Sequence, residues 1–393
     1  MISVSTPLGN ISNIGYNNMS VMGEPSVAAW AAQRIGNNIS LVDRVPADVL
    51  HLVHHYWYQF PPMNSLWDGI LGFVMGLLSV VSILGNGMVI YIFSSTKALR
   101  TPSNFLVLNL ALSDFLMMST NAVPMVINCY YETWVLGPTF CELYAMTASL
   151  YGFVSIWSMT FIAMDRYNVI VHGLSAKPLT KRGVLVRILL TWVIAACWSS
   201  APMFGWNKYI LEGNMTACGT DYFTTTWLNR SYIMVYSGIA YFTPLNIIIY
   251  SYWFIVQAVA AHEKSMREQA KKMNVTSLRS SDAAQKSTEF KLAKVALMTT
   301  ALWFFAWTPY LVTNYVGIFE AARISPLSSI WCSLFAKTSA VYNPIVYGIS
   351  HPKYRQALQR KFPALVCAEK PEGDSTSQTS VATNVNVAEE PAA

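Results

Sequence analysis

The chain has few charged residues for its length. Of its 393 residues only 12% are Asp, Glu, Lys or Arg, whereas a typical soluble domain has about 25%. Hydrophobic residues make up 53% and aromatic residues 13%. This composition excludes an ordinary soluble domain and a disordered chain. The net charge of +6 does not indicate a nucleic-acid partner, because so apolar a chain leaves little room for a basic face.

We also expect no cleavable signal peptide, because residues 1–30 show no basic start followed by an apolar core. Long apolar runs are present instead, and about 20 such residues cross a bilayer as a helix. Seven segments qualify: 67–94, 102–130, 138–165, 187–206, 231–261, 295–319 and 326–349. The sequence therefore predicts an all-α membrane protein with a bundle of seven transmembrane helices.

Basic residues are unevenly distributed between the two sides of these segments. The odd connections and residues 351–362 after the last span hold 19 of the 26 Lys and Arg residues. Basic residues concentrate on the cytoplasmic side, which places the N-terminus outside a plasma membrane. Glycosylation sequons agree with this orientation. They begin at Asn10, Asn18 and Asn38 in the N-terminal tail and at Asn214 and Asn229 in the fourth connection.

The chain divides into four predicted parts. Residues 1–64 form an extracellular tail and residues 65–350 form the seven-helix domain. Residues 351–363 are predicted to form an amphipathic helix on the membrane surface, where they contact lipid. Residues 364–393 are polar, rich in Ser and Thr and predicted to be a disordered cytoplasmic tail. Cys367, which follows the amphipathic stretch, is a candidate for palmitoylation.

Only six cysteines are present, and two of them lie where a disulfide is plausible. Cys141 opens the third span on the outside, and Cys218 lies in the outer connection between spans four and five. Both face an oxidising compartment. Cys129 is also near the outer surface, so the sequence does not force this pairing.

Two ionisable residues remain deep inside predicted spans, and each is a functional candidate because burying a charge in lipid is costly. Lys337 is about eleven residues, or roughly 16 Å, from either end of its span, so its side chain does not reach water as a snorkelling lysine does. Burial favours a neutral, nucleophilic amine that can attack a carbonyl. Asp114 can be hydrogen-bonded by Asn86 and Asn343. Such a cluster can hold a sodium ion or water, and a purely structural network is an equally good explanation.

Together these features resemble the rhodopsin-like G-protein-coupled receptors over about residues 65–365. Lys337, six residues before Asn343, is the mark of opsins within that family. His351-Pro352-Lys353 and the long basic third cytoplasmic loop resemble arthropod visual opsins coupled to Gq-class G proteins. The motifs that carry the resemblance are Gly85-Asn86, Leu110-Ala-Leu-Ser-Asp114, Asp165-Arg166-Tyr167, Trp192, Pro244 with Tyr252, Trp307-Thr-Pro309 and Asn343-Pro344-Ile-Val-Tyr347.

The resemblance implies that retinal, 11-cis in the dark, is bound to Lys337 as a protonated Schiff base. A protonated imine in a dry pocket needs a carboxylate nearby. Tyr144 stands where vertebrate visual opsins carry that carboxylate, and it is neutral. The resemblance to invertebrate opsins implies Glu212, six residues before Cys218, as counterion. Glu142 is the next candidate, and an exposed loop position is the alternative for Glu212.

Family positions also imply a pocket and a switch. For any one aromatic residue of the pocket, core packing is an equally good explanation. In the switch, Arg166 is paired in the dark and released on activation, when helices shift. The implied pocket residues are Tyr144, Gly152, Phe153, Tyr222, Tyr236, Trp307 and Tyr310. The implied switch residues are Asp165, Arg166, Tyr167, Glu289, Tyr252, Tyr347, Asn343, Pro344, Asp114 and Asn86.

The predicted function is therefore that of a photoreceptor and not of an enzyme. Light isomerises retinal, and the bundle then activates a G protein of the Gq class. A receptor kinase and an arrestin would act on the tail, because phosphorylation adds dense negative charge there. We expect a rhabdomere-type membrane and a photoproduct that keeps its proton and reverts with a second photon. The alternatives are a retinal photoisomerase on the same fold and a receptor for a diffusible ligand.

Overall fold

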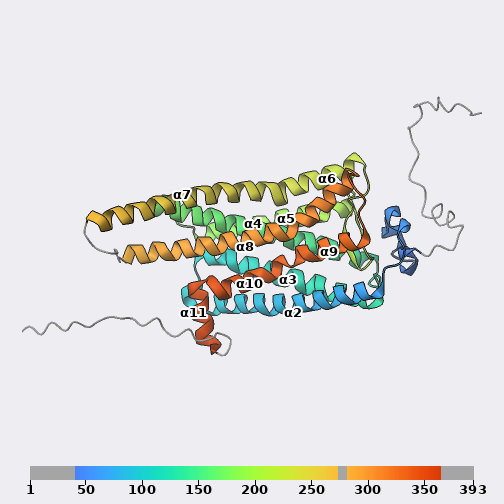
Figure 1. Ribbon diagram of the computed structural model, residues 1–393, viewed down its shortest axis with the longest axis horizontal. Coiled ribbons are helices and arrows are strands. Elements are labelled where there is room, and N and C mark those ends of the chain that lie inside the picture. Colours follow the sequence, from blue (N-terminus) through green and yellow to red (C-terminus); the bar gives the residue numbers. More distant parts are fainter. Residues whose placement is uncertain (1–39, 273–280, 364–393) are drawn as a thin grey trace, which may run out of the picture.

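The computed structural model describes residues 40–272 and 281–363. The predicted sequons at Asn10, Asn18 and Asn38 and the candidate Cys367 lie outside the described residues. Six helical segments in the described part are long and apolar enough to cross a membrane. A seventh crossing is built from two shorter helices in series, and all run roughly along the long axis of the molecule (Figure 1).

The helices follow the predicted spans in order. They are α2 (Ser65–Ser95), α3 (Pro102–Tyr131), α4 (Pro138–His172), α5 (Lys181–Ser200) with the 3₁₀ turn η6 (Ala201–Phe204), α6 (Trp227–Ser237) continued through the π-helical turn η7 (Gly238–Phe242) into α7 (Thr243–Lys272), α8 (Ser281–Ile318), and α9 (Pro326–Lys337) followed by α10 (Ser339–Ser350). The predicted seven-helix bundle is confirmed. A short helix, α11 (Pro352–Lys361), follows α10 and turns away from the bundle (Figure 1).

Polar caps fix where these helices begin. The side chain of Thr101 accepts a hydrogen bond from the backbone of α3, and Thr180 caps α5 in the same way. Ser325 forms a capping box at the start of α9, where Pro326 occupies the first turn. These residue types satisfy backbone N–H groups that have no partner inside the helix.

The C-terminal end of α7 and the N-terminal end of α8 extend beyond the predicted spans. Helix α7 continues to Lys272 and α8 begins at Ser281, whereas the apolar runs stop at 261 and start at 295. The additional residues contain no Gly or Pro and are rich in Ala, Glu, Gln and Lys, which favour helix. Hydropathy therefore located the apolar spans but not the ends of the helices.

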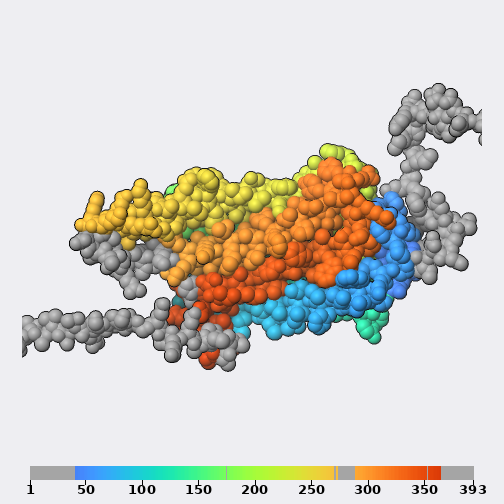
Figure 2. Space-filling model, viewed as in Figure 1, coloured from blue at the N-terminus to red at the C-terminus, as the bar shows by residue number. Residues whose placement is uncertain are grey.

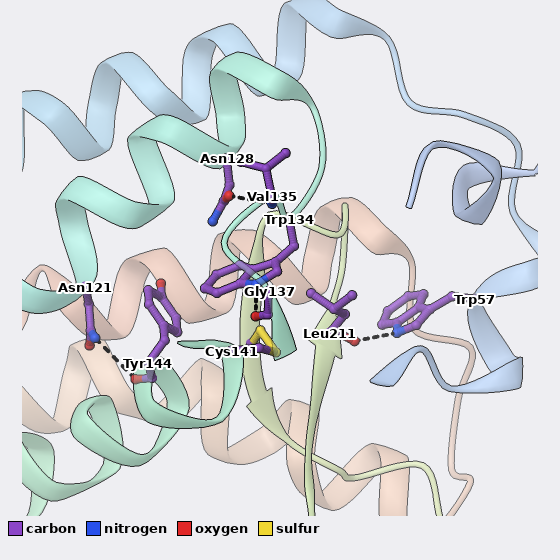
Figure 3. Close-up of a disulfide and its surroundings, with 10 residues drawn as sticks. Trp57, Asn121, Asn128, Trp134, Val135, Gly137, Cys141, Tyr144 and Leu211 are labelled. Carbon is purple, nitrogen blue, oxygen red and sulfur yellow. Dashed lines mark hydrogen bonds between the residues drawn. A yellow bond between two sulfur atoms is a disulfide. The ribbon is translucent and has the colours of Figure 1, made fainter. Parts of the chain in front are cut away.

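A small hairpin covers the outer end of the bundle, and we call residues 209–220 the lid. Strands β1 (Tyr209–Glu212) and β2 (Ala217–Thr220) pair antiparallel, with Glu212 opposite Ala217. A disulfide joins Cys218 to Cys141 at the outer end of α4 (Figure 3). This confirms the predicted disulfide, and it ties the lid down onto the bundle.

The N-terminal segment (residues 40–60) lies across the same end of the molecule, where it is blue in Figures 1 and 2. Its three 3₁₀ helices are η1 (Leu41–Arg44), η2 (Leu50–Leu52) and η3 (His55–Gln59). Val49 and Trp57 are fully buried. The segment is thus a packed outer layer over the lid.

Candidate functional site

Lys337 is the last residue of α9, where the seventh crossing breaks before α10. It is 5% exposed. Its Nζ donates to the Oγ of Ser333 at 3.1 Å, one turn back, and lies 5.6 Å from the centre of the Tyr144 ring. The helix break thus presents a buried amine to the interior of the bundle.

Glu212 ends strand β1 and is 1% exposed. Its Oε1 accepts a hydrogen bond from the Oη of Tyr310 at 2.8 Å. Its Oε2 is buried without a hydrogen-bond partner among the described residues. Burial raises the pKa of Glu212 to about 7, and the bond from Tyr310 and the positive charge of Lys337 act against that rise. Glu142, the other candidate, is partly exposed at the outer end of α4.

Two adjoining cavities lie inside the bundle and share Thr220, Tyr236, Trp307 and Tyr310. One contains Lys337, and the other is lined by Gly152 and Phe153. The lining is mostly apolar and aromatic, as ligand sites usually are.

Trp307 stands where the two cavities meet. Its Nε1 donates to the Oγ of Ser339 at 3.1 Å, and its ring stacks on Trp303 with centroids 5.3 Å apart. A Cβ on Gly152 would lie 2.8 Å from the Trp307 ring, so the missing side chain at 152 makes room for the indole. The candidate Tyr222 is fully buried outside the lining of these cavities, with its Oη 2.6 Å from Ser329.

These residues fit an elongated apolar group attached to Lys337. A positive charge kept at that nitrogen would be attracted by the carboxylate of Glu212, with which Lys337 interacts electrostatically. The Oη of Tyr144 is also buried without a partner in the described part of the chain. Buried polar atoms are normally hydrogen-bonded, so these two oxygen atoms are candidates to contact a bound group.

Comparison with known proteins agrees with this geometry. The sequence matches the family described as 7 transmembrane receptor (rhodopsin family) over residues 85–347. The chain belongs to this family.

The relatives narrow the assignment within the rhodopsin family. The chain is 65% identical over 370 residues to the rhodopsin of Sphodromantis sp., covering 94% of this chain and 98% of that protein. It is 63% identical over 369 residues to the long-wavelength rhodopsin of Apis mellifera, covering 93% and 98%. The crystal structure of squid rhodopsin superposes with a TM-score of 0.75 at 35% identity, covering 81% of this chain and 92% of that one. The chain is accordingly an invertebrate visual opsin, a retinal photoreceptor that couples to a G protein and not an enzyme.

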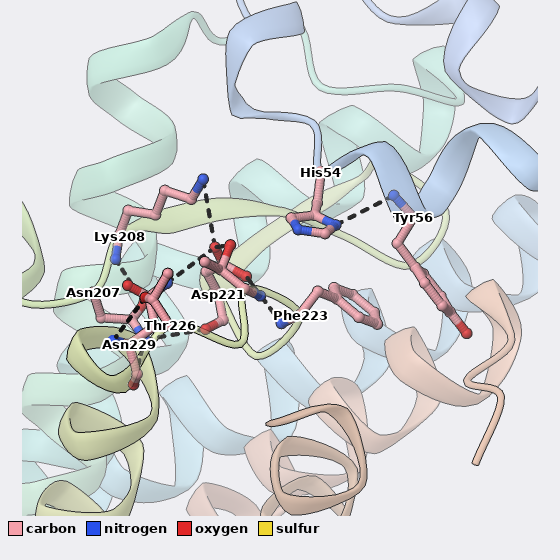
Figure 4. A network of polar contacts seen from close by, with 9 residues as sticks. His54, Tyr56, Asn207, Lys208, Asp221, Phe223, Thr226 and Asn229 are labelled. Atoms are coloured by element: carbon pink, nitrogen blue, oxygen red, sulfur yellow. Dashed lines mark hydrogen bonds and ion pairs between the residues drawn. The ribbon is translucent and has the colours of Figure 1, made fainter. Parts of the chain in front are cut away.

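The lid of this opsin is held by a polar network around Asp221 (Figure 4). The Oδ1 of Asp221 accepts from the backbone N–H of Phe223 at 2.9 Å, and Lys208 lies 3.5 Å from its Oδ2. The ring of His54, from the N-terminal segment, stacks on Phe223 with centroids 5.4 Å apart. The network fixes the chain that leaves the lid and joins it to the N-terminal segment.

Two of the sequons used for the orientation are buried in this region. Asn214 is 1% exposed and its side-chain amide donates to Asp68 of α2. Asn229 is 7% exposed and donates to the Oδ2 of Asp221 at 3.3 Å. Both amides serve the fold, so the orientation rests on the basic residues and on the N-terminal sequons.

Midway through the bundle, the Oδ2 of Asp114 accepts from the side-chain amide of Asn343 at 2.6 Å. Asn86 does not complete this pair. Its amide donates to the backbone oxygen of Ala340 at 2.8 Å and to Ser82. Pro344 lies inside α10 next to Asn343 and cannot donate a backbone hydrogen bond there, so the cluster adjoins a weak point of the helix.

At the end of the bundle opposite the lid, Arg166 pairs with both Asp165 and Glu289, which links α4 to α8. Tyr252 on α7 donates to the backbone oxygen of Ala293 at 3.0 Å. Arg166 and Glu289 line a cavity together with Tyr347 of α10 and with His351, which caps α11. Tyr167 faces away from this cavity, because its ring packs against His172, Tyr250 and Phe254.

Proposed function

We propose that 11-cis-retinal is attached to Lys337 and that Glu212 is the counterion of the attached group. The observation that carries this proposal is that the buried amine of Lys337 interacts electrostatically with the buried carboxylate of Glu212, whose Oε2 has no hydrogen-bond partner in the described chain. Retinal supplies light absorption and isomerisation. The chain supplies the nucleophile, excludes water and places a negative charge where a proton must be kept.

Tyr144 and Tyr310 assist in different ways. Tyr144 cannot carry charge near neutral pH, so the third crossing offers the pocket an oriented hydroxyl and a ring beside Lys337. Tyr310 donates to the Oε1 of Glu212, which holds that carboxylate in one orientation. The negative charge therefore comes from the lid and not from a transmembrane helix.

The decisive experiment is the variant Lys337→Ala, expressed and supplied with 11-cis-retinal. We expect no visible absorption band, whereas Lys361→Ala in the surface helix α11 keeps the band. A visible band in Lys337→Ala would overturn the attachment site. Glu212→Gln should still attach retinal to Lys337. As the pH rises, this variant should lose its visible band at a much lower pH than wild type does.

For the signalling step we propose a Gq-class partner, followed by a receptor kinase and an arrestin, in a rhabdomere-type photoreceptor membrane. The ion pair of Arg166 and Glu289 and the cavity beside it support a helix shift that opens the cytoplasmic face. The test is light-dependent nucleotide exchange with purified G proteins of several classes. Exchange fastest with Gq supports the proposal, and a pigment that isomerises retinal without exchange on any of them would favour a photoisomerase.

We also propose that the photoproduct is bistable. Glu212 belongs to a disulfide-anchored lid, so a shift of the transmembrane helices need not carry this charge away. A second photon should then restore the original spectrum. An ultraviolet-absorbing product that releases retinal would contradict this proposal.

A further inference from the structure

Trp57 connects the N-terminal segment to the strand that carries Glu212. The indole is fully buried, and its Nε1 donates to the backbone oxygen of Leu211 at 3.2 Å (Figure 3). Leu211 directly precedes Glu212 in β1. The two residues of this hydrogen bond are 154 positions apart in the chain.

The geometry of the peptide bond gives this contact its importance. The carbonyl of Leu211 and the N–H of Glu212 belong to one planar peptide unit. A hydrogen bond to that carbonyl therefore limits rotation of the plane from which the Glu212 side chain departs. The Cα of Glu212 belongs to the same peptide unit. A small rotation of this plane therefore moves the Glu212 carboxylate towards or away from the pocket.

The indole is itself held in place. Its ring packs edge-on against Phe223, which follows the lid, with centroids 5.0 Å apart. The neighbouring Tyr56 fastens the same segment to the connection between α8 and α9. Its Oη donates to the backbone oxygen of Ile324 at 2.9 Å and accepts from the N–H of Ile324 at 2.7 Å.

We propose that Trp57 is a positioning residue for the Glu212 carboxylate, and that the N-terminal segment thereby tunes the visible band from outside the bundle. This inference rests on the proposed role of Glu212 as counterion. Trp57 does not touch the pocket. It acts through the Leu211–Glu212 peptide plane.

Trp57→Phe tests the proposal because it keeps an aromatic ring and removes the N–H donor. Tyr56→Phe is the matched control, since it removes hydrogen bonds of the same segment that lead to Ile324 and not to β1. The first measurement uses the retinal-free opsin. Hydrogen exchange of the amides of residues 209–212 should become about fivefold faster in Trp57→Phe, the effect expected for one lost hydrogen bond, and stay unchanged in Tyr56→Phe.

The second measurement uses the pigment reconstituted with 11-cis-retinal. In Trp57→Phe we expect a shifted absorption maximum, and loss of the visible band at a pH about one unit lower than in wild type. The control should keep both values. In a Glu212→Gln background, adding Trp57→Phe should cause no further change.

Several outcomes would overturn the proposal. The first is that hydrogen exchange in β1 is the same in Trp57→Phe as in wild type. The second is that Trp57→Phe and Tyr56→Phe change the spectrum equally. The third is that Trp57→Phe has its full effect in the Glu212→Gln background. If Glu212→Gln alone leaves the spectrum and its pH dependence unchanged, the counterion assignment fails instead. The exchange experiment then still decides whether Trp57 holds β1.

Discussion

The carboxylate of Glu212 lies directly against the α-carbon of Gly219. The two residues are diagonal neighbours on the same face of the hairpin, because Glu212 pairs with Ala217. A Cβ built on Gly219 would lie under 3.0 Å from the carboxyl carbon and from both its oxygens. The counterion candidate thus occupies space that exists only because residue 219 has no side chain.

We therefore predict that Gly219→Ala displaces the Glu212 carboxylate and breaks its hydrogen bond from Tyr310. The reconstituted pigment should absorb at longer wavelength, because a more distant counterion stabilises the positive charge less in the dark state. Its visible band should also be lost at a lower pH. Both quantities come from spectra recorded across a pH titration.

Gly69→Ala is the control for this experiment. It makes the same chemical change near the outer end of α2, where a Cβ would meet nothing within 4 Å. A wild-type spectrum for Gly219→Ala would show that the carboxylate can move away without consequence, and it would weaken the counterion assignment.

We expect the ion pair of Arg166 and Glu289 to keep the rate of nucleotide exchange low in the dark. Glu289→Gln removes the negative charge that joins α8 to α4. The side chain of Glu289 is 28% exposed and that of Arg166 is 10% exposed. A partly exposed ion pair contributes about 1 kcal/mol, so the dark rate of nucleotide exchange should rise roughly fivefold. The measurement is exchange on a G protein before illumination.

Glu263→Gln serves as its control, because Glu263 pairs with Arg267 on one exposed stretch of α7. Neutralising that pair should leave the dark rate unchanged. An equal rise in both variants would assign the effect to lost surface charge and not to the link between α4 and α8.

Buried His54 predicts how the outer layer responds to acid. Burial lowers the pKa of His54 to about 4 from 6.5, and Asp221 acts in the opposite direction. Between these values the unfolded chain binds a proton at this site that the folded chain does not. Stability contributed here is therefore complete above pH 6.5 and is lost as the pH falls towards 4.

The variant His54→Asn tests this expectation in the retinal-free opsin. The Nδ1 of His54 accepts a hydrogen bond from the N–H of Tyr56 at the start of η3, and asparagine can replace that cap without titrating. The melting temperature of the variant should fall less steeply than that of wild type between pH 6.5 and 4.5. Parallel curves would mean that His54 does not carry the acid sensitivity.

Much of the fold was predictable because apolar length decides what crosses a membrane. The burial of Lys337 at the end of α9 was predictable for the same reason, since a lysine in the middle of a long apolar run cannot reach water. The helix ends at Lys272 and Ser281 were not predictable from hydropathy, because helix propensity continues where apolarity stops.

The outer layer was the least predictable part of the molecule. Glu212 followed from family position alone, and the sequence does not show that its carboxylate turns into the bundle. Trp57 and Gly219 were missed. A contact across 154 residues has no local pattern, and a glycine in a strand indicates a close approach without naming the partner.

The buried sequons give a final prediction. Asn214 is hydrogen-bonded to Asp68 beneath the lid, and Thr216 of the same sequon is fully buried and donates to Asn214 at 2.7 Å. A glycan added there would have to be enclosed in the protein, so folded opsin should carry none at Asn214 or Asn229. The fraction of the opsin that binds retinal can be purified and its peptides analysed by mass spectrometry. Glycans should be found only within residues 1–39. A glycan on Asn214 in that fraction would mean that the lid does not close as described.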